Sequence, residues 1–516
     1  MSNDYSRLVR ETAHGSLMIL VGQVASSLIL ALAVVIVGRL LGPDRWADYT
    51  VVMIPVSIAT VLMDPGVTTA LTKHLSQYLH QGRDEERKTI QLTGTAIILL
   101  LATALTLTVF LLAPQIAQLY LQRPELGPLL RIASLSILGQ ALINASNAIF
   151  IGQQRMGLQA ATQVLFAVLK TLAMPALVLI GFGSGGAIMG HTASILVTGV
   201  VAIFLTLTFL KTPKGHQQTM SPTEAGLILR YGAPIFISSL IGNGLSWLYN
   251  SLMLTYVANG PIGNWSAAQQ FAVLISFLVV PISTTIFPLF SRLKRGSANL
   301  SHAYRNSIKY SALIVLPGAA ALIALSEPMI RIIYGASFTQ APAYFQLLLL
   351  TYLPAGIGSI GPAALLNGQG ETRITLRMNI ITFLVGAPLS LALIPTYGIT
   401  GLIAATIIAP LPSILYSVYW IKRNMGLTPE WGSSAKIYAS AFAALAATLA
   451  LTMLIPLTPW LQLILGGLTY LATYAAALKL TRTLNDEDYK MFRAIIGDTG
   501  PLAKPLNRIL EAFEKS

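Results

Sequence analysis

Long apolar stretches separated by short polar or Pro/Gly-rich breaks run along the whole chain. One helix needs about 20 apolar residues to cross a bilayer, and residues 231–291, which contain no Asp, Glu, Lys or Arg, are long enough for two crossings. The pattern predicts 14 transmembrane helices, which begin near residues 16, 47, 89, 132, 157, 186, 231, 265, 310, 343, 374, 400, 436 and 460. The apolar runs are continuous, without the alternation of barrel strands, so we expect an all-α membrane protein.

Composition agrees with this fold class. The chain is 54% hydrophobic and 10% charged, whereas about a quarter of the residues in a soluble globule are charged. The first apolar run is about 25 residues long, too long for the core of a signal peptide, so we expect it to be retained as an anchor. The absence of cysteine excludes disulfides, thiolate chemistry and Cys-ligated metals.

Basic residues fall mostly in alternate connecting segments. With the N-terminus inside, 27 of the 33 Lys and Arg residues lie on the cytoplasmic side and five on the opposite side. Because cytoplasmic loops collect Lys and Arg, this asymmetry predicts a multi-pass protein of the cytoplasmic membrane with both termini in the cytoplasm. The net charge of +14 is then explained by topology and by anionic lipid, without nucleic acid as a partner.

Three pairs of short motifs recur at offsets of 216, 215 and 218 residues. They are Gly152–Arg155 with Gly368–Glu371, Gly183–Gly186 with Gly398–Gly401, and Gly42–Pro43 with Gly260–Pro261. The repeating unit contains six spans, an even number, so both copies enter the membrane from the same side. This predicts two six-helix bundles related by a pseudo-two-fold axis along the membrane normal, followed by two additional helices.

The repeat also predicts the domain boundaries. We expect an N-terminal bundle, a cytoplasmic linker, a C-terminal bundle, two additional transmembrane helices and a cytoplasmic amphipathic tail, at residues 1–210, 211–226, 227–424, 425–483 and 484–516. In the tail, Asp486–Asp488 has the spacing of a metal-diphosphate motif, but no nucleotide-binding domain accompanies it, so we interpret it as a solvated charge cluster.

Several motifs resemble the polysaccharide-transporter branch of the multidrug/oligosaccharidyl-lipid/polysaccharide (MOP) exporter superfamily, and the resemblance covers almost the whole chain. These motifs are Gly38–Pro43, Tyr231–Pro234, Phe287–Ser291, Ala363–Glu371 and Leu393–Ile403. The resemblance implies 14 spans, two bundles and two extra helices, and a flippase for lipid-linked oligosaccharides that works by alternating access. The motifs mark the fold more strongly than the substrate.

Three titratable residues lie inside predicted spans. An ionisable group in the membrane is costly, so each is a functional candidate by default. Lys170 is a candidate ligand for a diphosphate. The resemblance implies that acidic residues on early helices face the cavity, which makes Asp64 a candidate for coupling to H+ or Na+. The alternative for both is a structural ion pair between them, or for Asp64 a helix cap. His191 is a second coupling candidate or a hydrogen-bonded structural histidine. No resident cofactor or metal is expected.

Polar side chains form stripes on two otherwise apolar helices. Their spacing places the members of each stripe on one helix face, where they line a wet cavity between the bundles or hold helices together. Gln23 is a further member of this predicted polar seam. Arg39 and Arg230 lie at opposite membrane faces, as electrostatic gates for an anionic head group or as interfacial anchors. The two stripes are Gln140, Asn144 and Asn147, and Asn243 and Asn250.

These features predict a flippase that moves a polyprenyl diphosphate-linked glycan across the membrane, with a polysaccharide polymerase or glycosyltransferases as candidate partners. A cation-coupled multidrug exporter of the same superfamily is the alternative within transport. A membrane glycosyltransferase is a weaker alternative, because its candidate carboxylates, Asp44 and Asp48, have no accompanying domain. A third class is a protein that keeps the fold without transporting. The chain has no P-loop, and we expect no enzymatic activity.

Overall fold

The computed structural model describes residues 2–209, 221–455, 458–485 and 488–489, with most side chains described from residue 22 onward. All the secondary structure in these ranges is helical. Short π-helical or 3-10 segments interrupt the helices at Ile116–Tyr120, Pro124–Leu126, Val178–Phe182 and Leu350–Ile357. The α-helices are α1 (Ser2–Leu62), α2 (Val67–His80), α3 (Asp84–Leu111), α4 (Ala113–Gln115), α5 (Gly127–Gly152), α6 (Met156–Leu177), α7 (Gly183–Phe209), α8 (Pro222–Tyr256), α9 (Asn259–Arg292), α10 (Ala298–Tyr334), α11 (Ala341–Leu349), α12 (Gly361–Gly368), α13 (Thr372–Ile408), α14 (Leu411–Met425), α15 (Trp431–Leu454) and α16 (Pro459–Leu480).

Ten of the helical segments in the described ranges are long and apolar enough to cross a membrane, or eleven if the bent pair Ala341–Ile357 and Gly361–Gly368 counts as one span. The all-α membrane class is therefore confirmed. The number is lower than the predicted 14 because several predicted pairs of spans form one continuous but kinked helical segment. Such kinks occur at Gly42 in α1, at Gly181 between α6 and α7, and at Gly398 in α13.

The predicted repeat is visible in the backbone of matching turns. Gly183 has φ 55° and ψ −137°, and Gly398, 215 residues later, has φ 58° and ψ −129°. Only glycine adopts this conformation without strain. In the other motif pair, the amide of Arg155 donates to the carbonyl of Phe150 at 2.7 Å, and 216 residues later the amide of Glu371 donates to that of Leu366 at 2.7 Å. The two copies therefore use the same local turns.

The chain forms two compact units. The first comprises Met1–Gln270 with Ala336–Phe338 and Ser390–Leu402, and the second comprises Phe271–Gly335, Thr339–Leu389 and Ile403–Ser516. Each unit groups segments that contact one another, whereas the predicted domains are divided according to the internal repeat. The predicted domain boundaries therefore stay a prediction.

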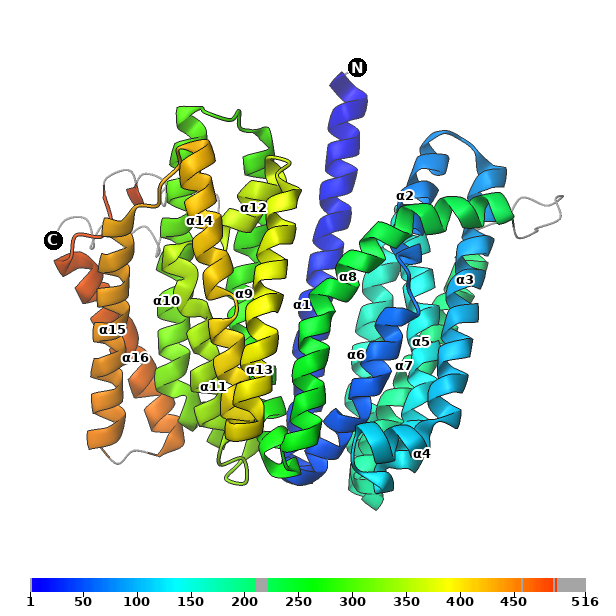
Figure 1. Cartoon of the computed structure of the whole chain (residues 1–516), viewed down its shortest axis with the longest axis horizontal. Coiled ribbons are helices and arrows are strands. Elements are labelled where there is room, and N and C mark those ends of the chain that lie inside the picture. The colour runs from blue at the N-terminus through cyan, green and yellow to red at the C-terminus, as the bar shows by residue number, and fades with distance from the viewer. Residues whose placement is uncertain (1, 210–220, 456–457, 486–487, 490–516) are drawn as a thin grey trace. The chain divides into compact units, whose positions relative to one another are not determined.

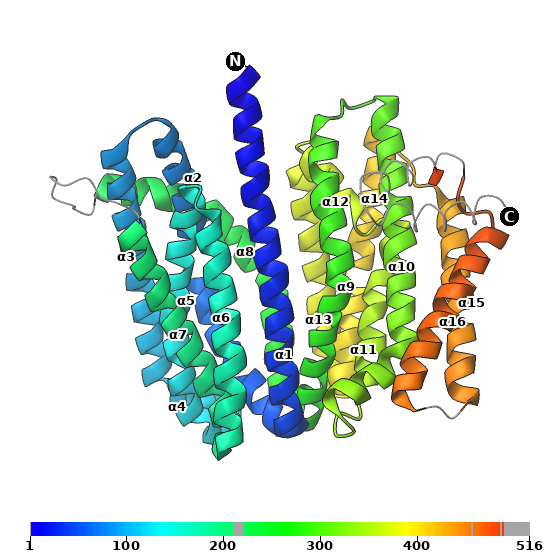
Figure 2. The ribbon, with the colours of Figure 1, turned by 180° about the vertical axis from the view of Figure 1, so that it is seen from behind.

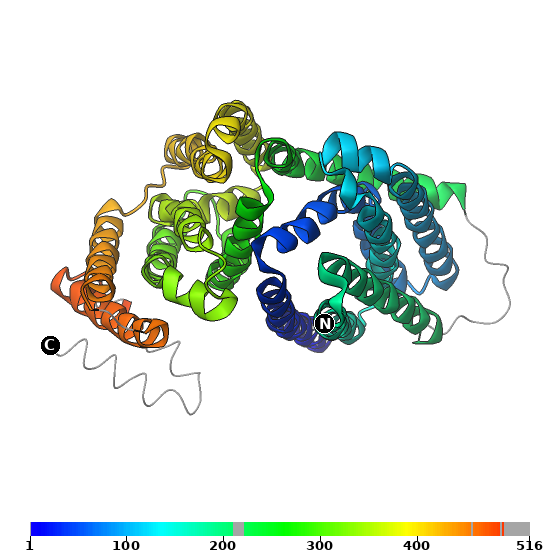
Figure 3. The same cartoon turned by 90° about the horizontal axis from the view of Figure 1, so that it is seen from below.

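In the first unit, α5, α6 and α7 pack on one another, α1 packs along α6, and α2 and α3 pack on α5 (Figure 1; the end-on view in Figure 3 shows the helix axes). Small residues allow this close packing. A Cβ added to Gly139 of α5 would lie 2.9 Å from the backbone of Ile195 in α7, and one added to Gly190 of α7 would lie 2.6 Å from the backbone of Met174 in α6. Gly and Ala at such contacts are typical of helices that pack in membranes.

In the second unit, α10 packs against both α15 and α16, which also pack on each other (Figure 2). Small and aromatic side chains fill this contact, among them Ala320, Ala444 and Tyr470. A second buried cluster lies between α10, α12, α13 and α14 and includes Tyr304, Leu366 and Ile421. The two C-terminal helices therefore belong to the core of this unit.

The interpretation of the tail cluster as solvated is wrong for Asp488. This carboxylate is buried and lies 2.6 Å from the Nζ atom of Lys309, and the Tyr310 hydroxyl donates to it at 2.7 Å. The backbone amide of Asn485 also donates to Asp488, at 2.8 Å. The ion pair ties the chain beyond α16 to the first half of α10. The predicted amphipathic tail lies mostly outside the described residues.

Candidate functional site

Lys170 lies on α6 and is half-buried in the first unit. Its Nζ atom donates to the hydroxyl of Tyr49 on α1 at 3.3 Å, and the rings of Tyr49 and Phe166 lie 5.9 and 5.7 Å from it. Among the described residues Lys170 has no carboxylate within ion-pair distance, so the predicted alternative of a pair with Asp64 is not found. The ammonium is therefore held by a neutral hydroxyl and aromatic faces.

The same hydroxyl also contacts His191. The Nδ1 atom of His191 on α7 lies 3.2 Å from the Tyr49 oxygen, so Tyr49 joins α1, α6 and α7 through one atom. The His191 ring is 8% exposed and packs edge-on against Phe166, and Trp46 stacks on Tyr49 with ring centroids 5.0 Å apart. With Lys170 charged and donating to the Tyr49 oxygen, the phenol hydrogen is free to be donated to a neutral His191.

Asp64 acts as a cap in this structure. Its Oδ1 atom accepts from the backbone amide of Thr68 at 3.1 Å, and its other oxygen accepts from the Thr68 hydroxyl. Both contacts lie in the first turn of α2, which begins after Pro65 and the left-handed Gly66. A carboxylate at a helix N-terminus is stabilised by free amides and by the helix dipole, so the capping alternative accounts for Asp64. Its coupling role stays a prediction.

Each member of the stripe on α5 is half-buried and forms at least one side-chain hydrogen bond. The side-chain amide of Gln140 donates to the Oδ1 atom of Asn144 at 2.7 Å, and the hydroxyl of Thr162 on α6 donates to the Oδ1 atom of Asn147 at 3.0 Å. Asn147 therefore links α5 to α6, which agrees with the interpretation that the stripe holds helices together. The single hydrogen bond between Gln140 and Asn144 leaves the Oε1 atom of Gln140 and the Nδ2 atom of Asn144 without a hydrogen bond to any described residue.

The remaining predicted residues are spread over α1 and α8. Asn243 donates to the carbonyl of Ser239 in its own helix at 2.8 Å, and Asn250 has no hydrogen bond to any described residue. Gln23 and Arg39 are exposed on α1, and Arg230 is exposed on α8. The structure thus brings Lys170 and His191 together but does not gather these residues with them.

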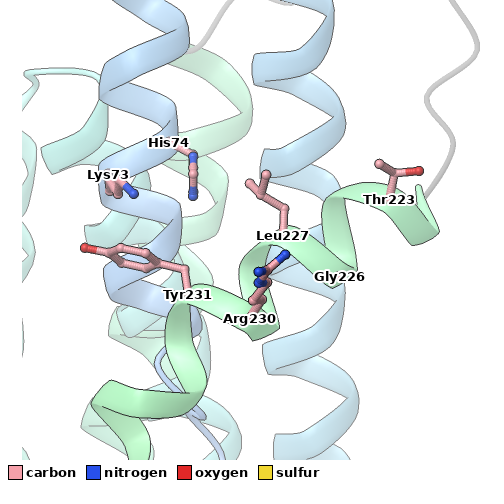
Figure 4. Close-up of a pocket in the computed structure, with 7 residues that line it drawn as sticks. All are labelled: Lys73, His74, Thr223, Gly226, Leu227, Arg230 and Tyr231. Carbon is pink, nitrogen blue, oxygen red and sulfur yellow. The ribbon is translucent and has the colours of Figure 1, made fainter.

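Arg230 instead lines a pocket between α2 and α8, here named the α2–α8 pocket, with a volume of about 700 Å³ (Figure 4). The Nζ atom of Lys73 lies 3.9 Å from the centre of the Tyr231 ring, and the His74 ring packs edge-on against Tyr231 with centroids 5.8 Å apart. Burial and the neighbouring Lys73 ammonium lower the pKa of His74, so the imidazole is neutral at pH 7. The pocket is lined by Lys73, His74, Thr223, Gly226, Leu227, Arg230 and Tyr231.

Two glycines bring α2 and α8 together below this pocket. A Cβ added to Gly66 would lie 2.4 Å from the carbonyl oxygen of Gly232, and one added to Gly232 would lie 2.5 Å from that of Pro65. The two backbones therefore meet at Gly66 and Gly232, where neither position has room for a side chain.

Gly232→Ala is expected to destabilise the protein by about 1–3 kcal/mol, the usual cost of overpacking a tight contact. Gly226→Ala, six residues earlier in α8, is the matched control, because a Cβ there meets nothing within 4 Å. In an open helical position Ala is favoured over Gly by up to about 1 kcal/mol. Thermal unfolding in detergent compares the two variants; equal melting temperatures would contradict the close contact.

Sequence reasoning missed Tyr49, Lys73 and His74. Tyr49 follows Asp48 at the start of a predicted span and carries no charge that would draw attention to it. Asp48 itself, a carboxylate considered for a glycosyltransferase, accepts from the side-chain amide of Asn259 at 3.1 Å.

Within the described residues no three His, Asp or Glu side chains come together in a group that could hold a metal ion.

Comparison with known proteins places these features in a family. Residues 36–343, more than half of the chain, match the family model described as polysaccharide biosynthesis protein. The chain is 19% identical over 482 residues to a probable low-salt glycan biosynthesis flippase of Haloferax volcanii, covering 93% of this chain and 98% of that protein. It is 22% identical over 413 residues to the lipid II flippase MurJ of Bacillus subtilis, covering 70% and 73%.

Solved structures share the fold. The lipid II flippase MurJ in an inward closed conformation matches with a TM-score of 0.75 and 18% identity, covering 90% of this chain and 99% of that one. An inward-facing multidrug resistance MATE transporter matches with a TM-score of 0.62 and 17% identity, covering 78% and 94%. Together with the family match, these similarities confirm the resemblance seen in the sequence motifs. The chain belongs to the polysaccharide biosynthesis protein family, in the polysaccharide-transporter branch of the MOP superfamily.

Proposed function

We propose that this protein is a flippase that moves polyprenyl diphosphate-linked oligosaccharide or polysaccharide repeat units across the cytoplasmic membrane by alternating access. The observation that carries the proposal is the Lys170 ammonium, which is held inside the first unit by a neutral hydroxyl rather than by a carboxylate. An ionisable side chain inside a membrane is a functional candidate by default, and a cation without a carboxylate partner among the described residues suits an anionic ligand. Relatives named as flippases or probable flippases support the same function, as does a relative named as a succinoglycan biosynthesis transport protein.

The charge chemistry suits a diphosphate. A lysine acts on phosphate oxygens as a compact point charge with three donors. The Gln140–Asn144 pair on the neighbouring helix α5 retains amide groups suited to sugar hydroxyls. The polyprenyl tail would stay in lipid, so that only the polar head requires a polar route. Enzymatic activity is not needed for this task.

The proposed topology has 14 crossings with both termini in the cytoplasm. Division of the kinked helices at Gly42, Gly181 and Gly398, together with the bent pair, yields 14 segments from the long helices. The excess of Lys and Arg in alternate segments supports the orientation. In this topology the α2–α8 pocket faces the cytoplasm.

Deletion of the gene in its native host tests the proposal. We expect polyprenyl-linked glycan to accumulate on the cytoplasmic side and the surface glycan to disappear, with both defects reversed by the plasmid-borne gene. Drug sensitivity is measured in parallel. Unchanged glycan levels combined with hypersensitivity to several drugs would favour the multidrug exporter and contradict the flippase.

A further inference from the structure

The α2–α8 pocket carries an excess of positive charge. Lys73 and Arg230 are both exposed, and no carboxylate is among the seven residues that line it. Of the nearby carboxylates, Glu86 forms an ion pair with Arg83 at 3.0 Å. Glu224, beside the lining residue Thr223, accepts from the Tyr78 hydroxyl at 3.5 Å and forms no ion pair in the described part of the chain, so two cations face one carboxylate. Within the described residues neither Lys73 nor Arg230 forms an ion pair. The pocket is therefore suited to an anion.

His74 adds a buried group without a partner. The residue is 8% exposed, and its Nε2 atom has no hydrogen bond to any described residue. Its ring packs edge-on against Tyr231 and also contacts the ring of Tyr78, with His74 and Tyr78 centroids 6.2 Å apart. Figure 4 shows the ring between the side chains of Lys73 and Leu227. A buried polar atom without a protein partner is satisfied by a ligand, an ion or a water, and an imidazole protonated at Nε2 can donate to an oxyanion.

The first turns of α8 favour the same charge. Ser221 caps this 35-residue helix by accepting from the amide of Glu224 at 3.4 Å, and the Thr223 hydroxyl lines the pocket. The N-terminal end of a helix carries a partial positive charge, which attracts phosphate groups. Two cations, an imidazole and a helix terminus thus converge on one pocket.

We propose that the α2–α8 pocket binds a phosphate group, held by Lys73 and Arg230 and by the buried nitrogen of His74. The phosphate comes from an anionic lipid headgroup or from a free phosphate in solution, since both present the same oxyanion. Because Lys73 and His74 belong to α2 and Arg230 belongs to α8, the bound group joins these helices above the Gly66–Gly232 contact. This site is separate from Lys170, and its existence does not depend on the flippase proposal.

Binding to the purified full-length protein in neutral detergent tests this site. The two probes are inorganic phosphate and short-chain phosphatidylglycerol, with short-chain phosphatidylcholine as the zwitterionic comparison. We expect Lys73→Gln and Arg230→Gln each to weaken binding by about tenfold and the double variant to abolish it, as the loss of charge-assisted hydrogen bonds implies. His74→Phe, which keeps the ring contacts with Tyr231, is expected to weaken binding several-fold.

Arg295→Gln is the matched control, because it removes an exposed cation of the second unit that pairs with Glu371 at 3.0 Å. It should leave binding unchanged. Tighter binding of phosphatidylglycerol than of phosphate would identify a lipid as the source, and the reverse would identify a soluble phosphate; both support the site. Absence of binding by the unaltered protein, or equal affinities of the double variant and Arg295→Gln, would overturn it. So would an unchanged affinity in His74→Phe.

Discussion

Replacement of Lys170 by Met is expected to lower the rate of glycan translocation by one to two orders of magnitude. Methionine keeps most of the side-chain volume of lysine but removes the ammonium. A hydrogen bond to a charged group contributes about 1.5–3 kcal/mol, and about 1.4 kcal/mol corresponds to a factor of ten. The fold should persist, because Lys170 makes its only polar contact in the described structure with the Tyr49 hydroxyl. Export of labelled glycan in cells, normalised to the amount of protein in the membrane, measures the effect.

Two further variants separate charge from packing. Lys170→Arg keeps the positive charge and should retain part of the activity. Tyr49→Phe removes the hydroxyl that contacts both Lys170 and His191 but leaves the cation in place, so its effect should be smaller than that of Lys170→Met. Full activity in Lys170→Met would contradict the role proposed for the Lys170 ammonium and leave the proposed function without its structural support.

Lys309→Met is expected to cause the largest loss of stability. The Lys309 and Asp488 side chains are each 3% exposed, and their charged atoms lie 2.6 Å apart. Removing one member of a buried ion pair leaves an uncompensated charge, which typically costs about 3–5 kcal/mol. The melting temperature of the detergent-solubilised protein should therefore fall strongly.

The double variant Lys309→Met/Asp488→Leu should recover most of that stability, because two apolar side chains can replace a buried pair at little cost. The comparison pair is Arg295 with Glu371, whose side chains are 48% and 29% exposed. Arg295→Ala should change the free energy of unfolding by at most about 1 kcal/mol, as is usual for surface pairs. Similar losses in Lys309→Met and Arg295→Ala would contradict the burial of Asp488.

The fold class could be predicted because the bilayer imposes a simple length rule on apolar segments. The repeat could be predicted because turns such as Gly183 and Gly398 need positive φ, and this backbone requirement leaves glycines at a regular spacing. The number of separate helices could not be predicted. A kink at Gly42 or Gly398 leaves the helices on either side of it in one helical segment, and glycine and proline occur in the sequence both at such kinks and at true loops.

Candidate site residues were found where a charge stood out in an apolar stretch, as with Lys170 and His191. Their common partner Tyr49 was not found from the sequence, because only the packing of α1 against α6 and α7 brings the three side chains together. Asp488 was misjudged for the same reason: it lies 179 residues from Lys309, and a tail rich in charges gives no sign that one carboxylate is buried. Contacts over such separations depend on tertiary structure.

Movement of a diphosphate-linked sugar across a bilayer by this chain can be observed without a cell. The most direct measurement uses the purified protein in sealed vesicles with a polyprenyl diphosphate sugar carrying a fluorophore on the sugar, and adds a membrane-impermeant quencher outside. If the protein is a flippase, we expect the quencher to abolish first the fluorescence of substrate in the outer leaflet and then, in a second phase, that of substrate carried outward from the inner leaflet. Lys170→Met should slow the second phase. Quenching that stops at the outer leaflet, as in protein-free vesicles, would contradict the proposed function.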